Sequence, residues 1–218
     1  MAQATGVAAK HLRALERLKS VPKIERFYLA GGTAIAFHLD HRRSNDLDIF
    51  GPIGASFAPF QALARKDPSS AQVVRVGDAT LQMEIVGVPV DVVRYPYALL
   101  EKPVLGPAGF PTAGLMDLAT NKLAAVASRG LRRDFWDLFA ILRSGISLAD
   151  ACDAYIRRFG VAESDLYHVT VALTWFEELE AVLPAGMAPK RWDEIRLFFE
   201  DEVPRLVLAR PTKKKRPR

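Results

Sequence analysis

The sequence predicts a chain with a mixed α and β region first and a mostly helical region after it. Strand-like runs alternate with helical runs up to about residue 95, whereas helical periodicity dominates after residue 111. Between these regions, prolines and glycines recur from Pro96 to Pro111, as in a segment that joins two lobes. We therefore expect a core at residues 1–110, a helical lobe at residues 111–209 and a basic, disordered tail at residues 210–218.

Each element of the expected core has its own local signal. Apolar residues at helical spacing predict a helix at residues 7–19, and a β-prone run predicts a strand at residues 26–30. Residues 33–39 are typical of a helix, and the alternation of polar and apolar residues at 46–50 predicts a half-buried strand. The remaining expected elements are a helix at 57–66 and strands at 72–76, 80–86 and 90–95, with a turn at Gly87-Val88-Pro89.

The composition is typical of a folded protein in an aqueous compartment. Half of the residues are hydrophobic (50%) and a quarter are charged (25%). No run approaches the roughly 20 apolar residues that a membrane helix needs, and the first residues lack the apolar centre of a secretory signal. Cys152 is the single cysteine, which excludes a disulfide framework and a cysteine metal cluster. We expect a cytoplasmic protein without a membrane span.

The positive charge of the chain is concentrated at its carboxyl-terminal end. The formal net charge is +5, and residues 210–218 carry six Lys or Arg side chains and no acidic one, which leaves −1 for the rest. Such a tail is suited to contact the phosphates of a nucleic acid, but it is also typical of a solvated, disordered end. The charge alone therefore does not identify a partner.

Three aspartates carry the chemical signal of the core. Asp46 and Asp48 are two residues apart on an expected strand, so both side chains point to one face. Two carboxylates this close repel each other unless a cation lies between them, and Mg²⁺ prefers such oxygen ligands. Asp91 lies in a second strand-like run, and pairing of the two strands would bring it to the same place. Three carboxylates can hold two ions, one for the attacking hydroxyl and one for the leaving phosphate.

A glycine turn precedes the aspartates. Gly31, Gly32 and Thr33 stand between an expected strand and an expected helix. Glycines allow the backbone to approach a phosphate closely, and the amides at a helix start point toward its oxygens. The Thr33 hydroxyl is suited either to cap the helix or to bind a phosphate oxygen.

Each of these signals alone also has a plain structural interpretation. An isolated Asp-x-Asp is often a solvated strand edge, Asp91 alone fits an exposed hairpin position, and two glycines fit an ordinary turn. Their occurrence in one order, with a basic connection between helix and strand, favours a site that binds a metal and a triphosphate.

The expected helical lobe contributes cations. On a continuous helix over residues 115–142, Lys122, Arg129, Arg133 and Asp137 would share one face, unless Gly130 interrupts the helix. A lysine facing a carboxylate–metal centre would neutralise the charge of a triphosphate. Asp134 lies off that face, where it can start a second helix. The alternative for the Arg-Arg-Asp segment is a surface of ion pairs.

These motifs resemble a known family. The run LAGGTAIAFHLDHRRSNDLDIF, then VPVDVVRYPYALL and DLATNKLAAVASRGLRRDFWDLFAIL, is similar to the AbiEii/AbiGii nucleotidyltransferase toxins over about residues 25–143. The resemblance implies an α+β fold, a minimal nucleotidyltransferase of the polymerase-β type with a mixed sheet and a mostly helical carboxyl-terminal lobe. It also implies a bacterial toxin of a toxin–antitoxin or abortive-infection pair, neutralised by a separately encoded antitoxin. Some related toxins add nucleotides to the acceptor end of tRNA.

The resemblance assigns roles to residues of this chain. The implied metal ligands are Asp46, Asp48 and Asp91, and the implied catalytic residues are these three with Lys122 and Asp137. The residues expected to bind the nucleotide are Gly31, Gly32, Thr33, Arg42, Ser44, Lys122, Arg133 and Asp134. Beyond about residue 145 the resemblance ends.

The expected activity is Mg²⁺-dependent transfer of a nucleoside monophosphate from an NTP to an acceptor hydroxyl, with release of pyrophosphate. The acceptor we expect is RNA, in particular tRNA. Alternatives are a protein or small-molecule acceptor, a non-catalytic member of a toxin pair that binds a partner, and a glycosyltransferase. The last lacks the larger nucleotide-sugar domain expected before its Asp-x-Asp motif.

Overall fold

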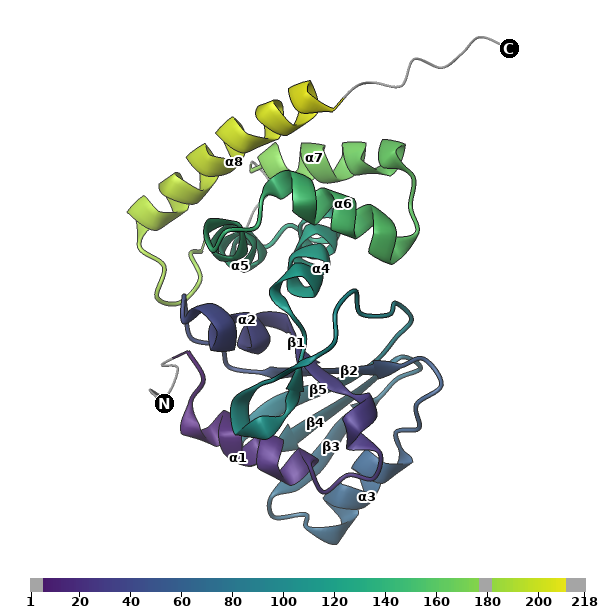
Figure 1. Ribbon diagram of the computed structural model, residues 1–218. Helices are drawn as coiled ribbons and strands as arrows, with labels where there is room; N and C mark the ends of the chain where they lie inside the picture. The colour runs from purple at the N-terminus through teal and green to yellow at the C-terminus, as the bar shows by residue number, and fades with distance from the viewer. Residues whose placement is uncertain (1–5, 177–181, 211–218) are drawn as a thin grey trace, which may run out of the picture. The chain divides into compact units, whose positions relative to one another are not determined.

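The computed structural model describes residues 6–176 and 182–210 of the chain (Figure 1). The chain divides into two compact units, Met1–Asn121 and Lys122–Arg218. The division falls inside helix α4 (Leu115–Ser128), further along the chain than the boundary expected at residues 110 and 111. No helix of the described residues has both the length and the apolarity to cross a membrane.

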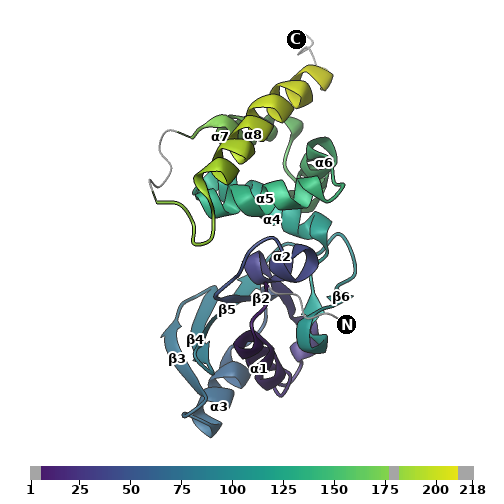
Figure 2. The same ribbon diagram turned by 90° about the vertical axis from the view of Figure 1, so that its left-hand side faces the viewer.

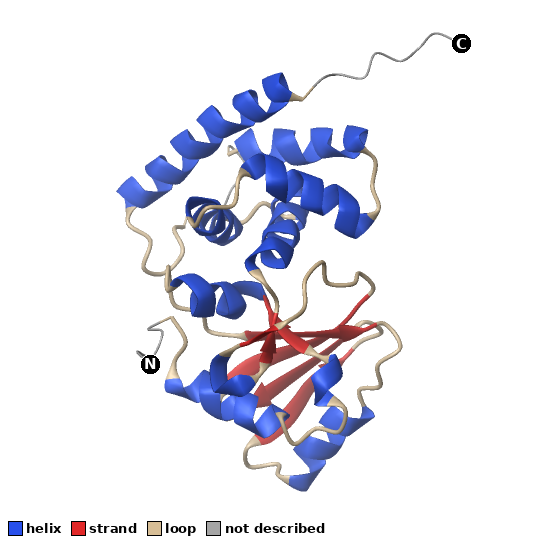
Figure 3. Ribbon diagram, in the orientation of Figure 1, coloured by secondary structure: helices blue, strands red, loops and turns tan. Residues whose placement is uncertain are grey.

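Unit 1, residues 1–121, is built on a seven-stranded mixed sheet with the order β3-β4-β5-β2-β1-β7-β6 (Figure 3). Strands β2 and β5 pair in parallel, as do β1 and β7, and the other neighbours are antiparallel. The strands are β1 (Tyr28–Ala30), β2 (Leu47–Pro52), β3 (Ala71–Val76), β4 (Thr80–Ile85), β5 (Val88–Tyr95), β6 (Val104–Leu105) and β7 (Pro111–Thr112). The mixed sheet, followed by a helical region, confirms the expected fold class.

Helices cover both faces of this sheet. Helices α1 (Ala9–Leu18) and α3 (Ala58–Lys66) lie on one face, and α2 (Gly31–Leu39) lies on the opposite face (Figures 1 and 2). A short 3₁₀ helix at Ile24–Arg26 lies between α1 and β1, and another at Pro107–Gly109 lies between β6 and β7.

Side-chain alternation sets which face of the sheet is buried. Along β2, Leu47 and Ile49 are fully buried while Asp48 and Phe50 are half-buried, as expected when successive side chains point to opposite faces. The buried face continues through β4 and β5 and is completed by apolar residues of α1 and α3; its members include Leu15, Leu18, Phe60, Leu81, Met83, Val90 and Val92. The half-buried face is therefore the one that carries polar groups.

The segment at residues 96–111 is not the simple linker that its composition predicts. It contains β6, the second 3₁₀ helix and β7, and β7 pairs with β1. Prolines and glycines are also typical of edge strands and tight turns, so composition alone could not separate the two cases. The expected turn at Gly87-Val88-Pro89 is likewise displaced: Val86 and Gly87 form it, both with positive φ, and Val88 begins β5.

Unit 2, residues 122–218, contains helices and no strand in its described part (Figure 3). Its aromatic core joins α5 to α8, where the Phe135 ring contacts the rings of Trp192 and Phe199 with centroids 5.9 and 5.6 Å apart. After the end of α4, the α-helices are α5 (Arg132–Arg143), α6 (Leu148–Phe159), α7 (Leu166–Thr174) and α8 (Pro189–Ala209), with a 3₁₀ helix at Glu163–Asp165. Arg210, expected to belong to the disordered tail, pairs with Asp153, and residues 211–218 lie outside the described residues.

Of the two possibilities for residues 115–142, one continuous helix or a helix interrupted at Gly130, the structure shows the interrupted one. Helix α4 ends at Ser128 and α5 begins at Arg132, with Gly130 in the left-handed region at φ 58°. Glycine adopts this conformation without the steric penalty of a side chain, so the interruption considered at Gly130 is the actual one. Lys122 and Arg133 therefore lie on different helices.

We expect Gly51→Ala to destabilise unit 1. A Cβ atom at Gly51 would overlap the ring of Phe27, which itself packs edge-on against Phe60 at 5.0 Å between centroids. Overpacking of this kind costs about 1–3 kcal/mol, measurable as a lower urea midpoint. Gly54→Ala is the control, because a Cβ atom there meets nothing within 4 Å. Equal midpoints for the two variants would contradict the described packing.

Candidate active site

The parallel pairing of β2 and β5 places Asp48 directly opposite Asp91. Paired residues of neighbouring strands point to the same face of a sheet, so both carboxylates lie on the half-buried face. Asp46 precedes β2 by one residue and is exposed to solvent. Asp48 and Asp91 are therefore neighbours on the two strands, and Asp46 lies just before the start of β2.

The pKa of Asp91 is affected by burial, by a hydrogen bond and by the charge of Asp46. Burial raises the pKa of its carboxyl group, a hydrogen bond from Gln82 Nε2 at 3.3 Å acts in the opposite direction, and the charge of Asp46 raises the pKa further. The net shift is upward. Asp91 and Asp46 thus interact across the two strands, as carboxylates beside a shared cation would in its absence.

The aspartates do not form a complete metal cage. Within the described ranges of the chain, no three acidic, histidine or cysteine side chains are grouped so that they could hold a metal ion. Mg²⁺, however, is usually bound by one or two carboxylates together with water and substrate phosphates. Hard oxygen donors on one accessible face fit that kind of site, and the phosphates would complete it.

The predicted glycine turn packs directly against these carboxylates. Gly31 is the first residue of α2 and has φ +62°, and a Cβ atom there would overlap Asp48 Oδ2. Glycine is therefore required both by conformation and by space. The hydroxyl of Thr33 donates to the Asp46 carbonyl and is buried, so it fixes the chain beside Asp46 and does not cap α2.

The predicted basic loop lies at the same helix start. A Cβ atom at Gly32 would lie 2.5 Å from Arg42 Nη2 and 3.2 Å from Ser44 Oγ. Ser44 Oγ donates to Asp46 Oδ1 at 3.1 Å. A guanidinium group and the amides of a helix start form a favourable environment for a phosphate, and here they adjoin the carboxylates. Unit 1 thus places Gly31 against Asp48, and Gly32 against Arg42 and Ser44; the roles of these residues stay predictions.

Residues 6–11 support the loop that carries Arg42 and Ser44 through hydrogen bonds of the Gly6 backbone. The sequence did not predict this contact. The Gly6 amide donates to Asp40 Oδ1 at 2.6 Å, and the Gly6 carbonyl accepts from the Ser44 amide at 3.4 Å. His11 is fully buried, accepts from the Ala8 amide at Nδ1, and has its pKa lowered by burial. A lone glycine and a histidine on a helix carry no sequence signal for such a role, so this support could only be found in the structure.

Unit 2 contains an internal ion cluster of Lys122, Arg129, Asp134 and Asp137, which differs from the predicted group in having Asp134 where Arg133 was expected. Lys122 Nζ lies 2.8 Å from Asp134 Oδ1 and 2.8 Å from Asp137 Oδ2, and both aspartates are fully buried. Arg129 adds two hydrogen bonds to Asp134, at 2.9 and 3.0 Å. Asp134 is thus a direct partner of Lys122 and not off its face as expected, whereas Arg133 is exposed.

The charges of this cluster stabilise one another. Burial alone would lower the pKa of Lys122, but the charges of Asp137 and Asp134 outweigh it and raise that pKa. Burial likewise favours a raised pKa at Asp134, and hydrogen bonds from Arg129 and Lys122 reverse this to a lowered pKa. Both groups are therefore held ionised.

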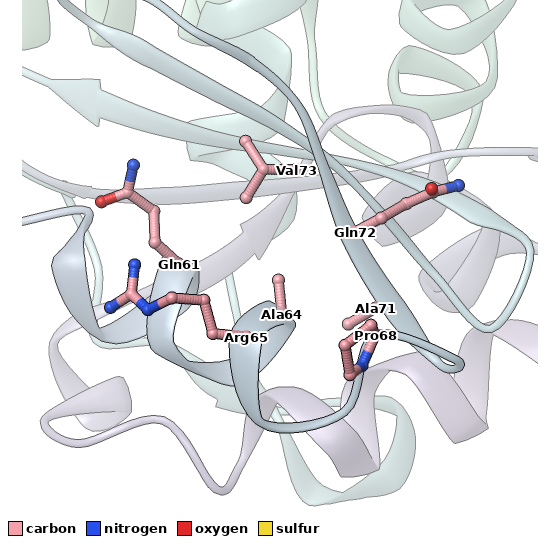
Figure 4. Close-up of a pocket in the computed structure, with 7 residues that line it drawn as sticks. All are labelled: Gln61, Ala64, Arg65, Pro68, Ala71, Gln72 and Val73. Atoms are coloured by element: carbon pink, nitrogen blue, oxygen red, sulfur yellow. The ribbon is translucent and has the colours of Figure 1, made fainter.

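A hollow of about 430 Å³ lies away from the carboxylates, between α3 and the edge strand β3 (Figure 4). Strands β4 and β5 separate β3 from β2. Its lining consists of Gln61, Ala64, Arg65, Pro68, Ala71, Gln72 and Val73. It contains none of the predicted site residues.

Comparison with known proteins identifies the class of enzyme. Residues 13–71 and 71–211 match the family described as nucleotidyl transferase AbiEii toxin, type IV TA system. The chain belongs to the AbiEii family. The resemblance read from the motifs is confirmed, and the enzyme class of this AbiEii chain is nucleotidyltransferase.

Two relatives of the AbiEii chain show how far the similarity extends. An uncharacterized protein of Aquifex aeolicus (strain VF5) is 30% identical over 193 residues, which is 87% of this chain and 92% of the relative. The solved structure of MenT4, a nucleotidyltransferase toxin of Mycobacterium tuberculosis H37Rv, aligns with a TM-score of 0.63 at 18% identity, over 94% of this chain and 86% of that one. The structural likeness shows a shared fold.

We expect Asp91→Asn to stabilise the AbiEii chain at neutral pH. Because the folded state raises the pKa of Asp91 above its usual 3.8, the ionised carboxylate destabilises the fold above that raised value. The asparagine should therefore add about 0.5–2 kcal/mol of stability at pH 7, and the gain should fade as the pH falls toward 3.8. Urea unfolding across this pH range measures it.

The matched control for this change is Asp78→Asn, because the Asp78 side chain is exposed and the same atoms are replaced. A loss of stability in Asp91→Asn at pH 7 would contradict the described electrostatics of the site.

We expect Asp134→Asn to destabilise the AbiEii chain strongly. The change removes one carboxylate of a buried cluster and leaves the charge of Lys122 incompletely compensated, which typically costs about 3–5 kcal/mol. Thermal unfolding is the measurement. Asp201→Asn breaks the exposed Arg205–Asp201 pair and should cost less than about 1 kcal/mol; equal effects would show that the buried cluster is not a structural element.

Proposed function

We propose that this AbiEii chain transfers a nucleoside monophosphate from an NTP to a hydroxyl of RNA, with tRNA as the favoured acceptor, in a Mg²⁺-dependent reaction. We further propose that it acts as the toxin of a pair whose antitoxin is separately encoded. The observation that supports the chemistry best is the register of β2 and β5, which sets Asp48 opposite Asp91 beside the Gly31 turn.

The triphosphate would bind at the start of α2. The amides of Gly31 and Gly32 belong to the first turn of this helix, where backbone N–H groups lack helical partners. The Arg42 guanidinium and Ser44 hydroxyl lie against Gly32 and would neutralise and hydrogen-bond phosphate oxygens. Residues 6–11 keep this loop in place.

The carboxylates would hold the metal between the triphosphate and the acceptor. Asp46, Asp48 and Asp91 are the proposed ligands, with two ions as the expected number. Bound Mg²⁺ would neutralise the charge of the phosphates and make the acceptor hydroxyl more acidic.

The acceptor hydroxyl would lie on the side of β5. Asp91 lies directly opposite Asp48 on the neighbouring strand, where its carboxylate would orient the acceptor hydroxyl or accept its proton. The acceptor oxygen then forms a bond to the α-phosphorus as the bond to pyrophosphate breaks, and the hydroxyl proton leaves through Asp91 or water. The arrangement requires the acceptor to approach along β5.

In unit 2, the predicted residues Asp134 and Asp137 both contact Lys122. Lys122 and Asp137 hold α4 against α5 through the buried cluster, and a contact of Lys122, Arg133, Asp134 or Asp137 with the NTP stays a prediction. The basic residues 213–218 of the sequence would add non-specific attraction to RNA phosphates.

We expect Asp48→Ala to abolish transfer. Incubation of the purified chain with Mg²⁺, total RNA and each NTP labelled at its α-phosphate should place label in RNA, and the variant should lower the rate by about two to three orders of magnitude. Asp78→Ala, an exposed aspartate on the turn before β4, should act like the unchanged chain.

The same experiment tests the alternatives. Label in the protein or in a small molecule, with none in RNA, would show that RNA is not the acceptor. Growth inhibition by the Asp48→Ala variant equal to that of the unchanged chain would favour a non-catalytic, partner-binding toxin.

A further inference from the structure

Unit 1 contains a second hollow, of about 480 Å³, at the ends of β2 and β5 that lie away from the Asp48–Asp91 pair. Aromatic side chains are prominent in its lining. The residues that matter here are Arg26, Tyr28, Pro52, Tyr95, Tyr97 and Leu99. No predicted site residue lies in this hollow, and the proposed reaction assigns it no role.

Strand register places the hollow on the same face as the carboxylates. Asp48 pairs with Asp91, and four pairs further along β2, Pro52 pairs with Tyr95. Because every second residue of a strand shares a face, Asp91 and Tyr95 point the same way. Four residues of a strand span about 13 Å, a distance that a few nucleotides of single strand can bridge.

Aromatic rings lie between the Asp48–Asp91 pair and the hollow. Phe50, two residues beyond Asp48 on β2, lies between them, and its ring centroid is 6.0 Å from that of Tyr28, a buried residue (9% exposed) that pairs with it from β1 and lines the hollow. Phe50 contacts Tyr95 at 4.7 Å, and Tyr95 contacts Tyr97 at 5.4 Å. The rings thus form a continuous row from beside the carboxylates to the hollow, and its last member, Tyr97, is 40% exposed.

The outer wall of the hollow is fixed in place. The fully buried carboxylate of Asp117 accepts hydrogen bonds from the amides of Leu100 and Glu101, at 2.9 and 3.2 Å. The Tyr95 hydroxyl donates to Asn121 Oδ1 at 3.0 Å. A wall and a ring that are already ordered lose little conformational entropy when a flat ligand binds.

We propose that the rings of Phe50, Tyr95 and Tyr97, which the buried Tyr28 ring supports from β1, bind unpaired bases of the RNA acceptor. The inference rests on the proposed function for its choice of RNA. Proteins bind single strands by stacking successive bases on aromatic side chains, and a row of rings of this length suits several bases. The Arg26 side chain at the rim would contact a phosphate or stack on a base.

The position of the row favours the acceptor over the NTP. The phosphate-binding groups, Gly32, Arg42 and Ser44, lie before β2, at the opposite end of that strand from the hollow. Asp91, which faces the acceptor hydroxyl in the proposed reaction, lies on the same strand as Tyr95. An acceptor end whose terminal hydroxyl reaches Asp91 would lay its preceding bases along the rings.

The test measures the affinity of the full chain for a short, fluorescent, single-stranded RNA without NTP, by fluorescence anisotropy. Tyr97→Ala should weaken binding about tenfold, the effect of losing one stacked base. Tyr97→Phe keeps the ring and should bind as the unchanged chain does. Tyr167→Ala removes a tyrosine of unit 2 that is 76% exposed, and it should have no effect.

Two further readouts separate stacking from a general structural role. Tyr97→Ala should leave the salt dependence of binding unchanged, because no phosphate contact is lost. An otherwise identical RNA with abasic residues should bind more weakly to the unchanged chain, and Tyr97→Ala should then weaken binding little further, since both changes remove one contact. Additive losses, or unaltered affinity of Tyr97→Ala, would overturn the proposal.

The outcomes also distinguish this proposal from the proposed function. If the chain labels RNA but Tyr97→Ala retains full RNA affinity, the proposal that the rings bind bases is wrong and the proposed function stands. If the chain binds RNA through Tyr97 but transfers no nucleotide to it, base binding by the rings stands and the proposed function is wrong. If RNA neither binds nor becomes labelled, both are wrong.

Discussion

The register between β2 and β5 is the constraint on which the rest of the structure depends. It sets two carboxylates, Asp48 and Asp91, side by side, although like charges repel and burial raises the pKa of Asp91. On the opposite face of the same strands, Leu47, Ile49 and Val92 are fully buried. Their burial stabilises the fold and offsets the repulsion. A slip of one residue would turn the aspartates into the core and the aliphatic side chains outward. The hydrophobic core therefore holds the charges where they repel, and a bound cation would relieve that repulsion.

The same register determines what surrounds the carboxylates. Its alternation places Phe50 and Tyr95 on the face of Asp48 and Asp91, so one pairing provides both the charged groups and the aromatic row. On the other side, Gly31 brings the start of α2 against Asp48, and no larger residue would fit. The amino-terminal segment then fixes the loop that carries Ser44 through the Gly6 backbone. The groups proposed to bind phosphate and the aromatic row thus lie on opposite sides of the carboxylates, an arrangement that suits the proposed transfer between two substrates.

Much of this could be predicted from local sequence patterns, and the remainder depends on contacts between distant residues. Alternation predicted the strands that carry Asp48 and Asp91, and the Gly31-Gly32 pair correctly marked the start of α2. The pattern could not show that Thr33 hydrogen-bonds the Asp46 carbonyl, that β7 joins the sheet or that Gly6 supports the loop, since each needs a partner far along the chain. The aromatic row was missed for the same reason: its rings come from separate strands. The roles assigned to the site residues themselves stay predictions, because contacts alone do not measure catalysis.

Lys122 shows why residue type and spacing cannot assign a role to a charged side chain. A lysine near aspartates fits both a phosphate-binding site and an internal ion pair, and the difference lies in how the charge is compensated. Here two fully buried carboxylates, Asp134 and Asp137, contact Lys122 Nζ at 2.8 Å, and Arg129 compensates Asp134 as well. A phosphate that took Lys122 from these partners would leave a buried carboxylate short of a cation, at a cost of about 3–5 kcal/mol. Binding of a triphosphate has to exceed that cost before Lys122 can contact it directly. We therefore infer that the first role of Lys122 is to fix α4 to α5, and that any effect of its substitution on transfer has to be separated from the loss of this support.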